Sequence, residues 1–171
     1  MVITRIRKVA KILISVIIII SALNYILPKY IIVNKTPSIR EGVYLLLPYD
    51  EKNPLEIGDI VIFDIPENIE KFIKERQYIS DDTHTFIKKV GATEGMKIEI
   101  KDNRLFINGI NEGEVSSTDS LKRNLPQIDS FIVSKGHFFP IGTHLQSFDG
   151  RYYGEIDMKT IKNKAKLLIG F

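Results

Sequence analysis

The feature that most constrains this chain is an apolar run at residues 12–27, close to the N-terminus. The run holds 16 residues without a charge and directly follows a basic flank at residues 5–11. As a helix rising about 1.5 Å per residue, it would extend roughly 24 Å, slightly less than the hydrocarbon core of a bilayer. Residues 9–10 or 30–33 bring the segment to spanning length, and Pro28 is expected to kink or end the helix at the far interface.

Two interpretations of this segment remain open. A basic flank, an apolar core and the small residues Ser21 and Ala22 are also the pattern of a cleaved signal peptide. The apolar stretch continues beyond Ala22, which favours a retained anchor. By the positive-inside rule, an anchor of this kind places the N-terminus in the cytoplasm and everything after Asn34 on the other side of the membrane.

Composition excludes several kinds of site. The chain has no cysteine, which excludes disulfides, zinc-thiolate sites and thiol catalysis. The three histidines are spread out and none has metal-ligand spacing with a carboxylate, so we expect neither a metal site nor a cofactor. The net charge of +3 is small, and much of the basic excess precedes the apolar run. This distribution favours a membrane surface over a nucleic-acid partner.

After residue 33 the pattern changes to short apolar alternations separated by turn residues, which is typical of β-strands. Strands are expected at Gly42–Pro48, 58–66, 85–92, 96–110 (a hairpin turning at Asp102 and Asn103), 130–142 and around 152–156. Residues 67–79 carry apolar side chains at helical spacing and predict a short helix, whereas residues 111–127 are polar and predict a loop. The sequence therefore predicts a mainly β domain on a membrane stalk.

The stretch NKTPSIREGVY, residues 34–44, places Ser38 shortly beyond the apolar segment. Pro37 and Ser38 are ordinary turn formers, and by themselves indicate only a turn. A serine hydroxyl becomes a nucleophile only where a base takes its proton. No histidine stands in a suitable motif, so the candidate base is a lysine.

Two adjacent lysines lie in a predicted strand, in the stretch FIKKVG at residues 86–91. Strand alternation puts Phe86, Lys88 and Val90 on one face and Ile87 and Lys89 on the other. Burial beside apolar neighbours lowers the pKa of a lysine, because it disfavours the charged form, and this makes Lys88 the candidate base. The alternative is that both are ordinary solvated lysines.

Four segments, in order, resemble the motifs of the membrane-anchored type I signal peptidases, and most closely the TraF-like branch associated with conjugative transfer. They are NKTPSIREGVY (34–44), GDIVIF (58–63), IKKVGATEGM (87–96) and SFDGRYYG (147–154). RQYI (76–79) and GHFFPIG (136–142) also resemble TraF-like segments. The resemblance covers residue 34 to the C-terminus and implies a signal-peptidase/LexA-like β-fold for the catalytic domain.

Carried over by position, the resemblance implies that Ser38 is the nucleophile and Lys88 the general base. Thr36 corresponds to a residue whose hydroxyl helps the Ser38 backbone N–H to form the oxyanion hole. Arg40 departs from the family pattern, which has proline there, and Lys89 replaces an arginine.

The last motif supplies residues that support this dyad. The resemblance implies that Ser147 hydrogen-bonds and orients the lysine, and that Asp149 and Arg151 form an ion pair bracing the site. Gly150 stands where the family has serine. None of these departures removes a catalytic group.

The function implied is that of a serine endopeptidase of the bacterial cytoplasmic membrane, with residues 1–33 as cytoplasmic flank and anchor and residues 34–171 as a periplasmic peptidase domain. Its partners would be membrane lipid, exported precursors with an Ala-x-Ala type of cleavage site, and components of the secretion apparatus. In the TraF-like branch, the precursors are pilin-type subunits of a conjugative or type IV secretion system.

Several alternatives stay open at this point. The acyl-enzyme can be resolved by water or by a peptide amine, the second giving a circular product. A self-cleaving protein of the LexA type shares the β-fold and dyad, although no DNA-binding module accompanies it here. A non-enzymatic, membrane-tethered assembly module is the third possibility.

Overall fold

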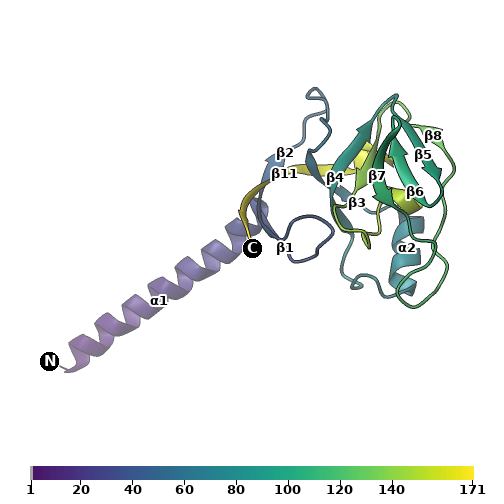
Figure 1. Cartoon of the computed structure of the whole chain (residues 1–171). Coiled ribbons are helices and arrows are strands. Elements are labelled where there is room, and N and C mark those ends of the chain that lie inside the picture. The colour runs from purple at the N-terminus through teal and green to yellow at the C-terminus, as the bar shows by residue number, and fades with distance from the viewer. Residues whose placement is uncertain (1) are drawn as a thin grey trace.

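The structure, a computed structural model, describes residues 2–171. Helix α1 (Val2–Ile26) projects away from the rest of the molecule and is followed by the short helix η1 (Leu27–Lys29) (Figure 1). The segment Ala10–Lys29 has a mean hydropathy of 2.2, is long and apolar enough to cross a membrane, and none of it is buried. The helix extends beyond the apolar run on its N-terminal side, where it includes the basic flank. Pro28 lies in η1, directly after α1 ends, as expected.

The remainder of the chain is built from two antiparallel sheets. The larger has seven strands in the order β1-β2-β11-β3-β4-β9-β10, and the smaller has four in the order β7-β6-β5-β8. The elements are β1 (Ile31–Asn34), β2 (Gly42–Pro48), β3 (Ile60–Asp64), α2 (Glu67–Glu75), β4 (Thr85–Thr93), β5 (Lys97–Lys101), β6 (Arg104–Ile107), β7 (Ile110–Glu114), β8 (Phe131–Ile132), β9 (His137–Ile141), α3 (Gly150–Tyr153), β10 (Ile156–Asp157), η2 (Met158–Thr160) and β11 (Ile161–Gly170). The prediction of a mainly β domain is confirmed.

Most predicted elements are present. The helix α2 and the hairpin β5–β6 lie where the sequence placed them, and the two hairpin-turn residues Asp102 and Asn103 both have positive φ angles, 50° and 57°. The segment 130–142 holds two short strands, β8 and β9, which lie in different sheets. The polar segment 111–127 begins as strand β7 before it becomes irregular.

One of two alternatives does not hold, one expected element was wrong, and one strand was not predicted. Residues 30–33 do not extend the helix, because Ile31–Asn34 form β1 and pair with β2. The predicted strand around 152–156 starts as the helix α3, since the Asp149 side chain accepts from the Arg151 N–H and caps it. The ten-residue strand Ile161–Gly170 was not predicted, because lysine and asparagine interrupt its apolar alternation.

Strand β11 holds the larger sheet together. It pairs antiparallel with β2 on one side (Lys166↔Leu45) and with β3 on the other (Lys164↔Val61). Strand β2 follows the Ser38 turn, and β3 leads into β4, which carries Lys88. Within the described residues, β11 is therefore the strand that connects the β1–β2 pair, which flanks Ser38, to β3 and β4, which carries Lys88.

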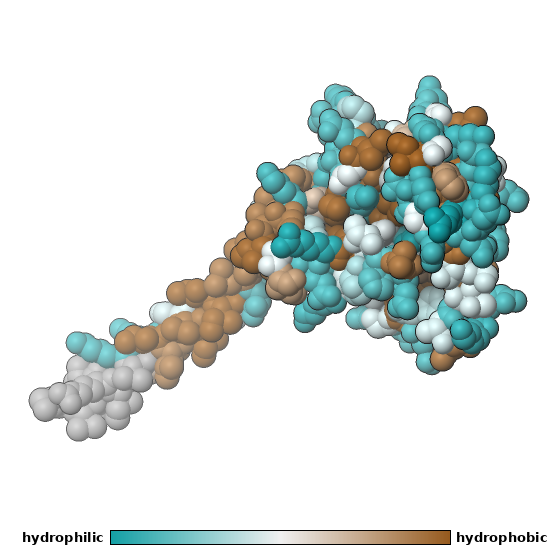
Figure 2. Space-filling model, in the orientation of Figure 1, coloured by the Kyte–Doolittle hydropathy of each residue, from teal (hydrophilic) through white to brown (hydrophobic). Residues whose placement is uncertain are grey.

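Apolar side chains pack on both faces of this sheet. One cluster, which includes Phe63, Val90 and Phe138, packs against Ile73 of α2. A second, on the other face, is made by Ile39, Tyr44, Ile62 and Ala165. A third lies over the smaller sheet and includes Ile98, Leu105 and Phe139. Figure 2 shows that hydrophobic residues also cover much of α1 and continue onto the adjoining end of the domain.

Candidate active site

Ser38 lies in the turn that joins β1 to β2, and it is half-buried. The next residue, Ile39, is 1% exposed and packs in the cluster with Tyr44 and Ile62. The Tyr44 hydroxyl donates to the carbonyl of Arg40 at 2.6 Å. The turn is therefore pinned directly after Ser38, while the Ser38 side chain is left at the surface of the site.

Asn34, the last residue of β1, holds the same turn from inside and was not among the residues predicted for the site. Its side-chain amide bonds the backbone on both sides of Ser38, at Thr36, Ile39 and Arg40. The Thr36 hydroxyl lies 3.2 Å from the Ser38 hydroxyl. Asparagine is a common turn former through its side chain, which is the only sequence signal that pointed to this residue.

Lys88 lies in β4 and is 4% exposed. Its Nζ donates to the Ser147 Oγ at 2.8 Å and lies 5.2 Å from the centre of the Phe86 ring. Desolvation by burial lowers the pKa of Lys88 from 10.5 to about 8, with Asp149 acting in the opposite direction and Arg151 adding to the decrease. At pH 7 about a tenth of this lysine is then uncharged, far more than for a lysine of ordinary pKa.

The alternation expected for β4 is present. Phe86 and Val90 pack in the cluster against α2, and Ile87 packs in the cluster on the other face. Lys88 is buried on the first of these faces, whereas Lys89 is only half-buried. The period of the strand thus separates the two lysines into different environments, as the sequence predicted.

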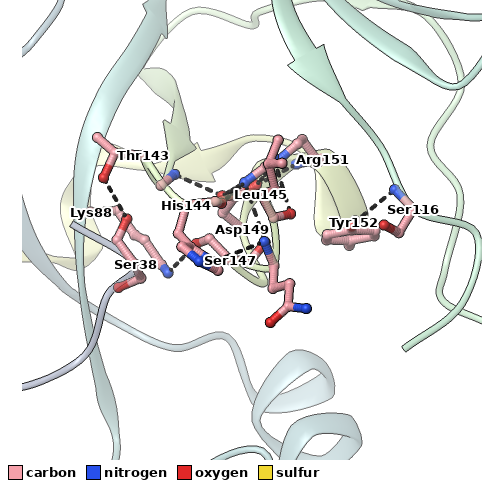
Figure 3. A network of polar contacts seen from close by, with 12 residues as sticks. Ser38, Lys88, Ser116, Thr143, His144, Leu145, Ser147, Asp149, Arg151 and Tyr152 are labelled. Atoms are coloured by element: carbon pink, nitrogen blue, oxygen red, sulfur yellow. Dashed lines mark hydrogen bonds and ion pairs between the residues drawn. The ribbon is translucent and has the colours of Figure 1, made fainter. Parts of the chain in front are cut away.

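The loop after β9 brings the Ser38 turn and Lys88 together (Figure 3). The Thr143 N–H donates to the Ser38 carbonyl at 2.7 Å, and Ser147, which receives the Lys88 hydrogen bond, lies four residues further on. A Cβ on Gly142 would collide with the Ser147 side chain and with the Ser38 carbonyl oxygen. Only glycine therefore allows both groups to approach the backbone at this position.

Asp149 and Arg151 form a buried ion pair behind this loop, with 0% and 2% of each residue exposed. The guanidinium binds both carboxylate oxygens, with Nε–Oδ1 at 2.8 Å and Nη2–Oδ2 at 2.7 Å. The Gly142 N–H donates to Asp149 at 2.7 Å, and Arg151 donates to the carbonyls of His144 and Ser147. The pair holds both ends of the loop that presents Ser147.

Breaking this pair is expected to destabilise the fold strongly. In Asp149→Ala the buried Arg151 guanidinium loses its counter-charge, and the free energy of unfolding should fall by about 3–5 kcal/mol. Urea denaturation followed by circular dichroism measures the change. Lys162→Ala is the matched control, because it removes an ion pair with Asp64 that is exposed to solvent, and should change stability by at most about 1 kcal/mol. Similar small changes in both variants would contradict a bracing role.

The structure thus brings all the candidate residues into one network. It runs from Thr36 and Ser38, through Thr143 and Gly142, to Asp149, Arg151, Ser147 and finally Lys88. Within the described part of the chain, no hydrogen bond joins Ser38 Oγ directly to Lys88 Nζ, since their partners are Thr36 and Ser147. Catalytic hydrogen bonds often form only once substrate is bound.

The chemistry available here is that of a hydroxyl beside a partly neutral amine. Residues 2–171 contain no group of three histidine, aspartate or glutamate side chains able to hold a metal ion. An exposed serine hydroxyl in the same network as a desolvated lysine, with further hydroxyl and N–H donors, is suited to acyl transfer.

A known protein family matches most of this chain. Residues 5–169 match the family described as signal peptidase, peptidase S26. Thylakoidal processing peptidase 1 of Arabidopsis thaliana is 31% identical over 111 residues, which make up 64% of this chain. The chain spans only 31% of the length of that relative.

Two bacterial relatives match over most of their length. The conjugal transfer protein TraF of Agrobacterium fabrum is 31% identical over 149 residues, covering 81% of this chain and 82% of that protein. The plasmid transfer protein TraF of Escherichia coli is 30% identical over 140 residues, covering 75% and 77%. Among solved structures, a signal peptidase I from Enterococcus faecalis aligns with a TM-score of 0.42 at 20% identity, covering 68% of this chain and 98% of the other.

Proposed function

The chain belongs to the signal peptidases of the peptidase S26 family, and on this premise we propose that it is a membrane-anchored endopeptidase with a Ser38/Lys88 dyad that removes leader segments from exported precursors. The observation that carries the proposal is the buried Lys88, whose ammonium group has Ser147 as its hydrogen-bond partner and whose pKa is lowered to about 8. Family membership also favours this function over a self-cleaving LexA-type protein and a non-enzymatic assembly module.

The proposed reaction proceeds by acyl transfer. Ser38 Oγ attacks the scissile carbonyl and its proton passes to the neutral Lys88 amine, which Ser147 holds in orientation. The Thr36 hydroxyl and the Ser38 N–H stabilise the oxyanion, and removing one such donor typically costs about 3 kcal/mol of transition-state stabilisation. Lys88 then gives its proton to the leaving amine, and water resolves the ester on Ser38.

The reaction should therefore accelerate as the pH rises toward the pKa of Lys88. Only the neutral amine accepts a proton, and below its pKa the neutral fraction rises about tenfold per pH unit. Because burial lowers that pKa from 10.5 to about 8, kcat/KM should increase with pH and level off above about 8. Initial rates of precursor cleavage across this range measure the profile. A rate that does not change with pH would argue against Lys88 as the base.

We place the active site at the outer surface of the cytoplasmic membrane, with residues 1–33 as flank and retained anchor and residues 34–171 as the periplasmic domain. Support comes from the apolar segment Ala10–Lys29 and from the basic residues before it, which favour a cytoplasmic N-terminus. Ser38 follows the end of this segment closely in the chain. A short tether of this kind raises the effective concentration of precursors held in the same membrane.

For the substrate we propose a pilin-type subunit of a conjugative secretion system. Two relatives named for conjugal or plasmid transfer match this chain over 82% and 77% of their own length, which supports that choice over a thylakoid-type precursor. Components of the secretion apparatus would then be neighbours of the enzyme in the membrane. A leader ending in Ala-x-Ala is the cleavage site that the family implies.

The test is cleavage by the purified full-length chain in detergent. A pilin precursor is incubated with the protein and the products are identified by intact mass. The mature subunit leaves as the amine in the first step, so the fragment that was esterified to Ser38 reports how the ester is resolved. Its linear mass indicates hydrolysis, and a mass lower by one water indicates closure by its own amine. An uncut precursor, with a folded enzyme and leaders of several sequences, would overturn the proposed function.

A further inference from the structure

Asn34 is one of the few buried polar residues of the domain, with 5% of its surface exposed. It is the last residue of β1 and pairs with Gly42, so its backbone belongs to the sheet. Its side chain makes all of its hydrogen bonds to the turn that carries Ser38. No other part of the described chain hydrogen-bonds to this amide group.

The orientation of the amide follows from its partners. The nitrogen faces three backbone carbonyls, of Thr36 at 2.8 Å, Ile39 at 3.3 Å and Arg40 at 3.2 Å. Carbonyl oxygens only accept, so exchanging the nitrogen and oxygen of Asn34 would set one acceptor against three others. The Oδ1 atom must therefore face the Thr36 backbone N–H, at 3.2 Å, and the Thr36 hydroxyl, at 2.8 Å.

This orientation fixes the direction of the hydroxyl protons. Because Asn34 Oδ1 only accepts, the Thr36 hydroxyl must donate its single proton to it. The contact of 3.2 Å between Thr36 Oγ1 and Ser38 Oγ then has Ser38 as its donor. Before substrate binds, the proton of the Ser38 hydroxyl is directed to Thr36.

We propose that Asn34 is a positioning residue of the peptidase reaction, which acts on Ser38 through Thr36. This role rests on the proposed function of Ser38 as nucleophile. Asn34 shapes the turn with its nitrogen and polarises the Thr36 hydroxyl with its oxygen, so that Ser38 Oγ is held in a single place.

When substrate binds, two of these hydroxyl protons have to change direction. For Thr36 to donate to the oxyanion, its proton has to rotate away from Asn34, and the proton of Ser38 has to rotate toward Lys88. Each step is a rotation about one C–O bond and requires no movement of the backbone. The site is thus set for attack while Asn34 keeps the turn in shape.

The test is a double-mutant cycle on the full-length protein, with cleavage of a leader-bearing precursor as the readout. Asn34→Ala should lower kcat by about a hundredfold, because Ser38 is no longer held in position, and should leave KM little changed. Thr36→Val should lower kcat as well. Because part of the effect of Asn34 passes through Thr36, the loss of kcat in the double variant should be smaller than the product of the two single losses.

Two matched variants separate positioning from general damage. Thr36→Ser retains a hydroxyl and should restore most of the kcat lost in Thr36→Val. Asn163→Ala removes an asparagine whose side chain bonds the Leu47 carbonyl at the sheet surface, and it should retain full kcat. Thermal unfolding of each protein shows whether it is folded.

The proposal is overturned if Asn34→Ala retains full kcat or if the two losses multiply in the double variant. If Asn34→Ala fails to fold, Thr36→Val gives the test instead, because Thr36 is exposed. An unchanged kcat in Thr36→Val would show that Asn34 does not act on Ser38 through Thr36. Loss of cleavage in Ser38→Ala, with full activity in Asn34→Ala, would reject the role of Asn34 and keep the peptidase function. Full activity in Ser38→Ala would reject both.

Discussion

The variant Ser38→Ala is expected to show no measurable precursor cleavage, a loss on the order of a thousandfold or more. In the proposed reaction Ser38 supplies the oxygen that forms the acyl intermediate, and alanine has no atom that replaces it. The side chain lies half-buried at the surface of the site, so its removal should leave the fold unchanged. Intact-mass analysis of a precursor after incubation measures the effect.

A matched serine makes this result specific. Ser130 lies on an exposed segment before β8, and Ser130→Ala should cleave at the wild-type rate. The wild-type enzyme, quenched with acid during turnover, should carry the leader peptide as an ester on Ser38, whereas Ser38→Ala should carry none. Continued cleavage by Ser38→Ala would show that the nucleophile lies elsewhere.

The second large effect is expected for Lys88→Met, which should abolish cleavage and at the same time stabilise the fold. Methionine has nearly the same length, fills the same buried space and cannot accept the serine proton. Lys89→Met, one residue along the strand, should remain active because that side chain lies on the other face. The reverse result, with Lys89→Met inactive, would show that the wrong lysine was chosen.

The gain in stability follows from the lowered pKa of Lys88. The folded protein binds this proton less tightly than the unfolded chain, so the free energy of unfolding falls as the pH drops from 10.5 through about 8, and then levels off. That shift corresponds to about 3 kcal/mol at neutral pH. Urea denaturation at several pH values should show the fall in the wild type and not in Lys88→Met, which should be more stable at pH 7 by up to this amount. A pH dependence that is equal in both proteins would contradict the shift.

Local sequence patterns were sufficient for much of the site. The alternation in β4 made Lys88 the candidate base, and the resemblance to a family supplied the role of Ser38 together with those of Ser147, Asp149 and Arg151. These residues sit in short motifs whose geometry is set by neighbours in the chain.

Features that depend on distant partners escaped prediction. The role of Asn34 depends on three backbone carbonyls that only the folded turn brings together. Strand β11 carries Lys162, Lys164 and Lys166, so its sequence does not show the apolar alternation of a strand. It forms because its backbone hydrogen-bonds to β2 on one side and to β3 on the other. Helix α3 replaces a predicted strand because a buried aspartate caps it.

The place of β11 in the sheet also sets the order in which activity can arise. Ser38 and Lys88 are made early in translation, but the strand that lies between their two parts of the sheet follows every other strand in the chain. A nascent chain that lacks β11 therefore carries Ser38 on a two-stranded hairpin, which is marginally stable by itself, and Lys88 on a separate group of strands. Among the described strands, the one synthesised last is therefore the one that joins the Ser38 and Lys88 parts of the sheet.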